Sequence, residues 1–265
     1  MNSELYYETI GNGPALLMMH GGLGLSHDYL RPYFDQLAED YTLIYYDHFG
    51  NGRSGRPNNF AELTFDRFIA DGADLMAHLG HENYTLIGHS YGGFIAQEFA
   101  AKRQEALNSL VLISTVPALD YQPQFSGTDA QMAAFGRMFS GPMTSDEEWR
   151  EAWSTAVEMY FHKYDDVTGR ALDGRTVYEH RAWNVSGELL ATFNTLDVLP
   201  KVSTPSLVMS GRHDGIAPPD SGGERIADLM PNAKLRVFEN SAHYSFIEEE
   251  DTFFKELKGW LKHQT

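Results

Sequence analysis

Short runs of apolar, β-branched and aromatic residues alternate with longer amphipathic stretches along most of the chain. The runs at 15–20, 41–47, 84–90, 107–115, 205–210 and 234–239 predict buried strands. Nearly continuous apolar strands that are separated by helices indicate a parallel sheet covered on both faces. A shorter run at 5–9 predicts an antiparallel edge strand, joined to the rest through the turn Gly11-Asn12-Gly13-Pro14.

The stretches between these strands have an apolar spacing near the helical period. Residues 64–79 place Phe65, Phe68, Ile69 and Leu75 on one face, and residues 92–102 and 253–261 predict two further helices. Strands alternating with helices in this way predict an α/β fold with a mostly parallel sheet between helical layers.

Residues 117–196 break this alternation. They are rich in Met, Trp, Phe and Tyr, with helix-like segments at 129–139 and 145–160 and no convincing strand. We expect a helical cap inserted over the carboxyl edge of the sheet, where open α/β folds bind ligands, and a core made of residues 1–116 and 197–265. A plain surface excursion is the alternative, but so many aromatic side chains need a surface to pack against.

Composition narrows the class of protein. With 265 residues, 42% of them hydrophobic and 22% charged, the chain suits a globular enzyme with one sizeable core. It contains no cysteine, which excludes disulfides, thiolate zinc sites and cysteine nucleophiles and fits a reducing cytoplasm.

The net charge of −17 disfavours two kinds of partner. A surface with 37 acidic and 20 basic side chains repels phosphate backbones and anionic lipids, so we expect neither nucleic-acid nor membrane partners. The N-terminal residues lack the features of a signal peptide, and no apolar run approaches the roughly 20 residues that span a bilayer. We expect a cytoplasmic protein that acts on a small molecule or a short peptide.

The segment Gly88-His89-Ser90-Tyr91-Gly92 fits the G-x-S-x-G nucleophile elbow. Glycines are needed in this turn because the neighbouring backbones approach too closely for a Cβ atom. The motif alone is weak, but here a predicted strand precedes it and a predicted helix follows. The helix N-terminus also directs its free N–H groups at the site. These flanks make Ser90 the candidate nucleophile.

A serine nucleophile needs a base, and the base needs an acid to hold its tautomer. His243 lies after the last predicted strand and just before the C-terminal helix, which places it at the same sheet edge as Ser90. Asp214 follows the preceding strand and suits the role of the acid. The order Ser, Asp, His is the one expected for this fold. Asp120 is the rival for the acid, after the strand that ends near Thr115.

Attack on a carbonyl creates an oxyanion that needs backbone donors. The N–H of Tyr91 is one candidate, and the other is Gly22 in His20-Gly21-Gly22-Leu23-Gly24, directly after a strand. The segment from Asp47 to Ser54 is predicted to brace the neighbouring turn. Among the histidines no ligand spacing typical of a metal site occurs, so we expect neither a metal nor a cofactor.

Taken together, these motifs resemble the proline iminopeptidase branch of the α/β-hydrolases. HGGLG-x-SHDYL at 20–30 is similar to the family's HGGPG segment, with Leu23 in place of its proline, and YYDHFGNGRS at 45–54 is similar to its Y-D-Q-x-G-x-G-x-S. GHSYGG, GRHD and SAH match the nucleophile, acid and base segments. The likeness covers nearly the whole chain outside the cap.

The resemblance also implies how a peptide substrate would be held. In iminopeptidases, glutamates from the cap and nearby loops bind the positively charged N-terminus of the substrate. One branch has a glutamate directly after the catalytic aspartate, where this chain has Gly215. Glu188 then becomes the candidate substrate-binding residue, although it is equally consistent with a solvated surface charge.

Three functions follow from the sequence. The first is a serine acyl hydrolase built like a proline iminopeptidase, which would cleave a small amide or ester through an acyl-enzyme. The second is a carboxylesterase or lactonase, which an apolar pocket would favour, whereas paired acidic residues facing Ser90 would favour the peptidase. The third is a non-catalytic hydrolase-fold binding protein, which the presence of all three triad residues disfavours.

Overall fold

The computed structural model describes residues 4–124 and 126–264. It has a seven-stranded sheet in the order β1-β3-β2-β4-β5-β6-β7. The strands are β1 (Tyr7–Ile10), β2 (Ala15–Met19), β3 (Thr42–Tyr46), β4 (Tyr84–His89), β5 (Leu107–Ile113), β6 (Ser206–Gly211) and β7 (Ala233–Phe238). β1 pairs antiparallel with β3 at the edge, and the other pairs are parallel. The predicted α/β fold is confirmed.

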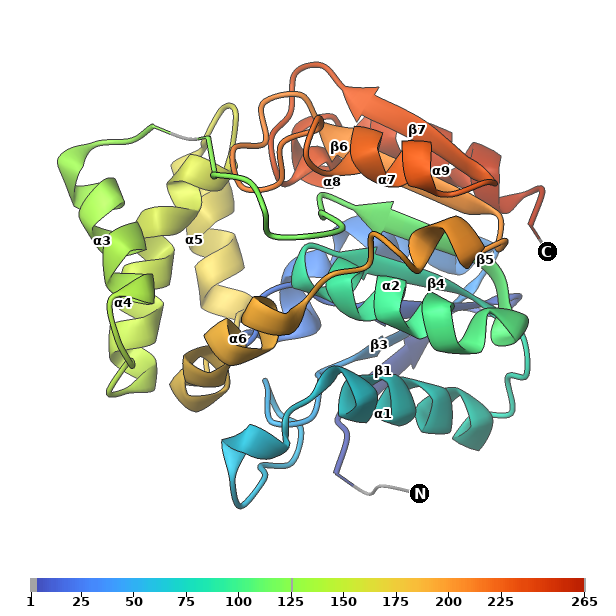
Figure 1. Ribbon diagram of the computed structural model, residues 1–265, viewed down its shortest axis with the longest axis horizontal. Coiled ribbons are helices and arrows are strands. Elements are labelled where there is room, and N and C mark those ends of the chain that lie inside the picture. The colour runs from blue at the N-terminus through green and yellow to red at the C-terminus, as the bar shows by residue number, and fades with distance from the viewer. Residues whose placement is uncertain (1–3, 125, 265) are drawn as a thin grey trace.

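The sheet is covered by helices on both faces. Because successive side chains of a strand point to opposite faces, Leu17 and Met19 of β2 join one hydrophobic core and Leu16 and Met18 join the other. The first core contains residues of α1 (Phe65–His78), α2 (Tyr91–Arg103) and α7 (Gly223–Leu229), and the second contains residues of α8 (Ser245–Glu248) and α9 (Glu250–Leu261). Figure 1 shows α1 and α2 side by side in front of the strands.

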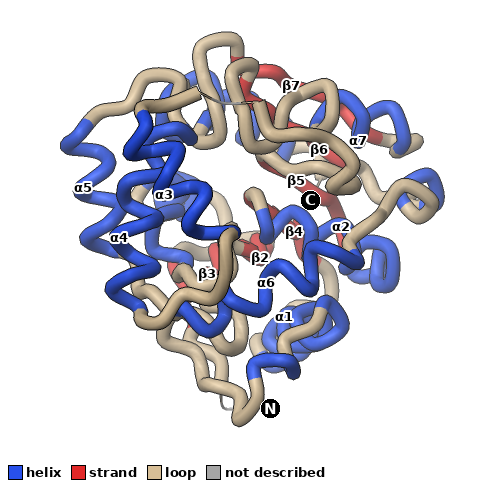
Figure 2. Tube along the Cα trace, turned by 60° about the vertical axis from the view of Figure 1, so that its left-hand side comes forward, coloured by secondary structure: helices blue, strands red, loops and turns tan. Residues whose placement is uncertain are grey.

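The described residues of the segment 117–196 form four α-helices: α3 (Asp129–Phe139), α4 (Asp146–Ala156), α5 (Asp166–Arg175) and α6 (His180–Thr192). The predicted segment 129–139 coincides with α3, whereas 145–160 is α4 followed by a 3-10 turn. Met138, Met143 and the fully buried Trp149 belong to a third hydrophobic cluster, which also contains Leu25 from the loop after β2. Figure 2 shows α3, α4 and α5 packed together beside the sheet. Within the described ranges, no helix is both long and apolar enough to cross a membrane.

The two ends of this segment meet next to α2. Ala118 pairs with Asn194 in an isolated bridge, and the Thr195 N–H donates to the Pro117 carbonyl at 2.9 Å. The side-chain amide of the buried Gln97 in α2 donates to the Val116 carbonyl at 3.0 Å, and its oxygen accepts from the Thr195 hydroxyl at 2.8 Å. The helix that follows Ser90 therefore holds both ends of the segment in place.

Candidate active site

Ser90 occupies the turn between β4 and α2. Its backbone has φ 55° and ψ −120°, a left-handed conformation that is strained for a residue with a side chain. The flanking glycines are sterically required: a Cβ on Gly92 would lie 2.1 Å from the Met19 carbonyl oxygen, and one on Gly88 would lie 2.5 Å from that of Gly92. The local geometry is that of the predicted nucleophile elbow.

His243 and Asp214 meet at the same edge of the sheet. Their Nδ1 and Oδ2 atoms are 2.8 Å apart, and both side chains are almost completely buried. Since an ionised carboxylate only accepts hydrogen bonds, the His243 proton is on Nδ1 and Nε2 is free to act as the acceptor. The Tyr160 carbonyl accepts the His243 N–H at 3.0 Å and so holds the backbone of the base.

The Asp214 carboxylate is stabilised in its charged form. Burial acts to raise the pKa of Asp214, but the electrostatic attraction to His243 and the hydrogen bond from its ring outweigh it. The backbone N–H groups of Ile216 and Ala217, each 2.9 Å from Oδ1, add to this effect. The pKa of Asp214 is therefore below its usual value, and the carboxylate stays ionised at neutral pH.

Asp120, the rival for the acid, lies elsewhere. Its carboxylate is on the surface and forms a bidentate ion pair with Arg225, with oxygen–nitrogen distances of 2.6 and 3.0 Å. The structure therefore brings Asp214, and not Asp120, against His243.

The candidate oxyanion donors lie at the start of α2 and on the loop after β2. Tyr91 is the first residue of α2, where backbone N–H groups have no partner within the helix. Gly22, with φ +61°, follows β2, and both residues line the same cavity as Ser90. A Cβ on the adjacent Gly21 would lie 2.8 Å from the Ser90 Cβ, so this loop passes directly against the serine.

The segment that follows β3 holds the Gly22 loop from behind. Asp47 Oδ1 accepts the backbone N–H of His27 at 2.9 Å and its ring Nδ1–H at 2.7 Å, while Oδ2 accepts the Arg53 N–H at 2.8 Å. The Asn51 side chain accepts the N–H of Gly24 at 2.6 Å. These contacts are those of the brace predicted for residues 47–54.

The ring of the buried His20 forms hydrogen bonds with the backbone. Burial lowers the pKa of His20 to about 4, so its ring is neutral. Its Nδ1–H donates to the Gly21 carbonyl at 2.9 Å, and its Nε2 accepts the His48 N–H at 3.1 Å.

Two groups of described residues have side chains close enough together to hold a metal ion, one around Asp47 and one around Glu179. In each group arginines already pair with a carboxylate, so we assign neither as a metal site.

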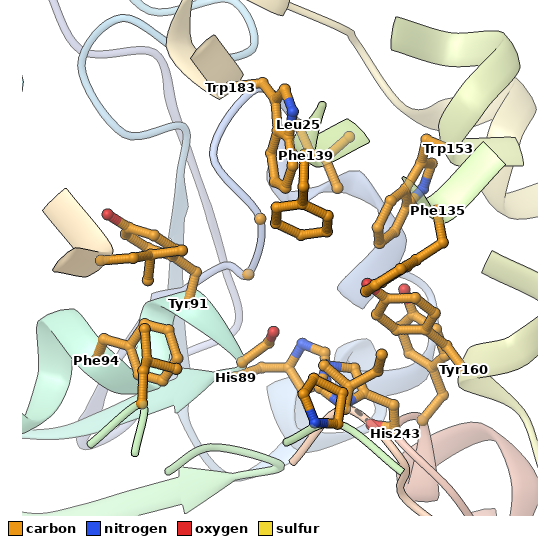
Figure 3. Close-up of a pocket in the computed structure, with 18 of the residues that line it drawn as sticks. Leu25, His89, Tyr91, Phe94, Phe135, Phe139, Trp153, Tyr160, Trp183 and His243 are labelled. Carbon is orange, nitrogen blue, oxygen red and sulfur yellow. Dashed lines mark hydrogen bonds between the residues drawn. The ribbon is translucent and has the colours of Figure 1, made fainter. Parts of the chain in front are cut away.

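A cavity of about 380 Å³ lies over Ser90 and His243. Its walls are largely aromatic, and Figure 3 shows rings from the core and from the segment 117–196 facing its interior. The aromatic side chains of this lining include Phe94, Phe135, Phe139, Trp153, Tyr160 and Trp183. None of the described residues that line the cavity is Asp, Glu, Lys or Arg.

A family model described as the alpha/beta hydrolase fold matches residues 14–250. The chain belongs to the α/β-hydrolase family. It is 26% identical to a proline iminopeptidase of Saccharolobus solfataricus, over 96% of this chain and 87% of that protein. It is 28% identical to a proline iminopeptidase of Lactobacillus helveticus, over 98% and 95%. The predicted resemblance to the proline iminopeptidase branch is confirmed, and the chain is a hydrolase enzyme of the α/β-hydrolase type.

Solved structures show the same fold. An esterase from Exiguobacterium antarcticum aligns with a TM-score of 0.82 and 23% identity, over 97% of this chain and 95% of that one. An enol-lactonase from Burkholderia xenovorans aligns with a TM-score of 0.78 and 21% identity, over 97% and 96%. At these identities the likeness concerns the fold of the hydrolase.

The prediction that Glu188 binds the substrate is not supported by its position in this hydrolase. Glu188 is exposed on α6 and is not among the residues that line the cavity. The face of α6 that lines the cavity carries Trp183 and Leu190, seven positions apart and hence two helical turns. At about 100° per residue, Glu188 projects more than 120° away from both and points to solvent.

Sequence reasoning missed three contacts from the segment 117–196 and one from the core. The Trp149 indole donates to the Gly24 carbonyl at 2.9 Å and so fixes the loop after β2, and Glu179 donates its N–H to the same carbonyl at 3.0 Å. The Tyr160 carbonyl holds His243, and Tyr29 contacts Gly21. These partners are far apart in the sequence, and no local signal links them.

Proposed function

We propose that this α/β-hydrolase is a serine carboxylesterase, with Ser90 as nucleophile, His243 as general base and Asp214 as its acid partner. The observation that carries the proposal is the cavity over Ser90, whose aromatic walls contain no charged side chain among the described residues. Such a cavity suits a neutral, apolar substrate. The Asp214–His243 hydrogen bond and the strained turn at Ser90 support the catalytic roles.

The reaction proceeds through an acyl-enzyme. Ser90 Oγ attacks the ester carbonyl while His243 Nε2 takes the hydroxyl proton, and the backbone N–H groups of Gly22 and Tyr91 stabilise the oxyanion. Collapse of the tetrahedral intermediate breaks the ester C–O bond, and His243 returns the proton to the departing alcohol. Water, deprotonated by His243, then releases the acid and restores Ser90.

An aminopeptidase would need a carboxylate for the ammonium group of its substrate. Burying a cation without a counter-charge is costly, and the described walls of the cavity contain no carboxylate. The buried carboxylate of Glu179 is already paired with Arg56 and Arg181, and Gly215 stands where one branch of iminopeptidases has a glutamate. These observations favour an ester over an N-terminal proline peptide.

Proline iminopeptidase activity is the second candidate, because relatives that carry this name match nearly the whole chain. A comparison of kcat/KM for nitrophenyl butyrate and for proline nitroanilide separates the two functions. We expect the ester to exceed the anilide by at least about a hundredfold, since a desolvated ammonium without a partner costs several kcal/mol. Faster cleavage of the anilide would establish the peptidase instead. A lactone of similar size, run in parallel, tests for lactonase activity.

Glu188→Gln is expected to change kcat/KM by less than twofold on both substrates. An exposed carboxylate interacts with a cation by at most about 1 kcal/mol, and Glu188 lies outside the cavity. The measurement is kcat/KM of the variant and the wild type on the ester and on the anilide. A loss of more than tenfold that is confined to the anilide would place Glu188 in an ammonium site.

A further inference from the structure

The rim of the cavity is unusually apolar for a solvent-exposed surface. Among the described residues, four large hydrophobic side chains are exposed, and Leu119 (40%) and Phe139 (57%) both line the cavity. Leu119 lies in the connection after β5, and Phe139 ends α3. Exposed apolar side chains that are continuous with a pocket are typical of surfaces that a ligand covers.

Aromatic rings connect this rim with the interior of the cavity. The ring of Phe139 lies 5.0 Å from that of Phe135 and 5.4 Å from that of Trp183, measured between centroids. Figure 3 shows Phe139 beside Trp183 and Leu25, with Phe135 and Trp153 along the adjacent wall. The described lining between the rim and Ser90 has no charged side chain, so an apolar group would meet compatible surface along this whole path.

We infer that the substrate is an ester with an extended apolar chain or ring system, which reaches from the carbonyl at Ser90 to the rim formed by Leu119 and Phe139. This inference rests on the proposed esterase function and specifies its substrate class. Each methylene that enters the cavity leaves water, which stabilises the bound transition state by roughly 0.8 kcal/mol, equivalent to about a fourfold gain in kcat/KM.

Two series of esters test the inference. One is nitrophenyl acetate to nitrophenyl octanoate, which lengthens the acyl group, and the other is methyl to octyl acetate, which lengthens the alcohol. For the wild type, kcat/KM should rise about threefold or more per methylene in at least one series, which identifies the side that occupies the rim. A flat or falling profile in both series, with acetate still hydrolysed, would overturn the inference alone. No hydrolysis of any ester would overturn the proposed function as well.

The double variant Leu119→Ser, Phe139→Ser should lower the octanoate-to-acetate ratio of kcat/KM by at least about tenfold. Both side chains are exposed, so serine is compatible with folding at these positions. Val167→Ser is the matched control, because Val167 is also exposed, at 69%, but lies on α5 and does not line the cavity. An unchanged ratio in the double variant, or an equal fall in the control, would contradict a role for the rim.

A second, independent observation concerns a buried hydrogen-bond network formed by Tyr29 and His89, which both line the cavity. The Gly21 N–H donates to the Tyr29 hydroxyl at 2.7 Å, and this hydroxyl lies 2.7 Å from His89 Nδ1. On the other side of the ring, His89 Nε2 lies 3.1 Å from the carbonyl oxygen of His243. These hydrogen bonds therefore connect the loop that carries the candidate oxyanion donor Gly22 with the backbone of the candidate base His243.

The direction of each hydrogen bond follows from the chemistry of its ends. A carbonyl only accepts, so His89 Nε2 carries the proton and donates it to His243, and Nδ1 accepts from the Tyr29 hydroxyl. Burial lowers the pKa of His89 to about 3, which keeps the ring neutral and compatible with this arrangement. Each of the three donors in this hydrogen-bond network then has an acceptor.

The geometry points to Tyr29 and His89 as positioning residues. They fix the Gly21–Gly22 loop and the His243 backbone relative to each other on either side of Ser90. Tyr29→Phe removes the shared hydroxyl and leaves the Gly21 N–H and His89 Nδ1 without their partner. A misplacement of catalytic groups by about 1 Å can cost up to a hundredfold in rate. We therefore expect kcat on the ester to fall by at least about tenfold, with KM changed by less than twofold.

Tyr46→Phe is the matched control, because the Tyr46 hydroxyl is also buried and has no hydrogen-bond partner among the described residues. Equal kcat in the two variants, or a rise in KM in place of the fall in kcat, would overturn the assignment. If Tyr29→Phe fails to fold, two variants at His89 carry the test. His89→Gln keeps a donor for the His243 carbonyl and should retain clearly more kcat than His89→Met, and equal rates would contradict the proposal.

Discussion

Ser90→Ala is expected to lower kcat on the ester by at least about a thousandfold while the protein remains folded. The variant lacks the atom that forms the acyl-enzyme, and the loss of a triad member typically costs several orders of magnitude in kcat. The side chain lines an open cavity and supports no core packing, so folding should be preserved. The measurement is steady-state turnover, with far-ultraviolet circular dichroism and the unfolding midpoint of both proteins.

Ser114→Ala is the matched control for this experiment. Ser114 is also a non-glycine residue with positive φ, at 47°, and its buried hydroxyl has no partner among the described residues. It does not line the cavity. We expect the control to keep wild-type turnover within about twofold. More than a tenth of wild-type activity in Ser90→Ala would mean that another residue is the nucleophile.

Asp214→Asn is expected to lower kcat by about three to four orders of magnitude. The asparagine amide can donate to His243 Nδ1 and so favour the tautomer with its proton on Nε2, which cannot accept the serine proton. It also cannot balance the charge of the imidazolium that forms in the transition state. The measurement is kcat on the nitrophenyl ester near neutral pH, where the lowered pKa of Asp214 keeps the wild-type carboxylate ionised.

Asp120→Asn is the control for Asp214→Asn, because Asp120 is the other candidate for the acid of the triad. Its ion pair with Arg225 is on the surface, where solvent screens such pairs and they contribute little, so activity should stay within about twofold of wild type. A large loss of kcat in Asp120→Asn, together with unchanged kcat in Asp214→Asn, would show that the acid is Asp120, in the connection after β5.

The sheet could be predicted because its signals are local. Each buried strand is a short apolar run bounded by turn residues, and the runs at 84–90 and 205–210 contain β4 and most of β6. The close pairing of Asp214 with His243 follows from the same logic. In a parallel sheet the residues after neighbouring strands gather at one edge, and β6 and β7 are neighbours.

The substrate-binding region could not be predicted in the same way. The role given to Glu188 depended on the direction in which α6 turns its side chains, and this is decided by packing against distant segments. α5 was missed because Gly169 and Gly174 interrupt a weakly amphipathic stretch. The absence of charge in the described cavity walls depends on which faces of α3, α4 and α6 meet over Ser90, and no pattern within one segment contains that information.

The most direct test of the catalytic assignment is the mass of the intact protein after reaction with a fluorophosphonate, followed by peptide mapping. We expect a single adduct on the peptide that contains Ser90, because a serine activated by His243 displaces fluoride and retains the phosphonyl group. Ser90→Ala should acquire no adduct, and Ser114→Ala should react like the wild type. An unlabelled wild-type protein, or an adduct that persists in Ser90→Ala, would contradict the assignment of Ser90 as the nucleophile.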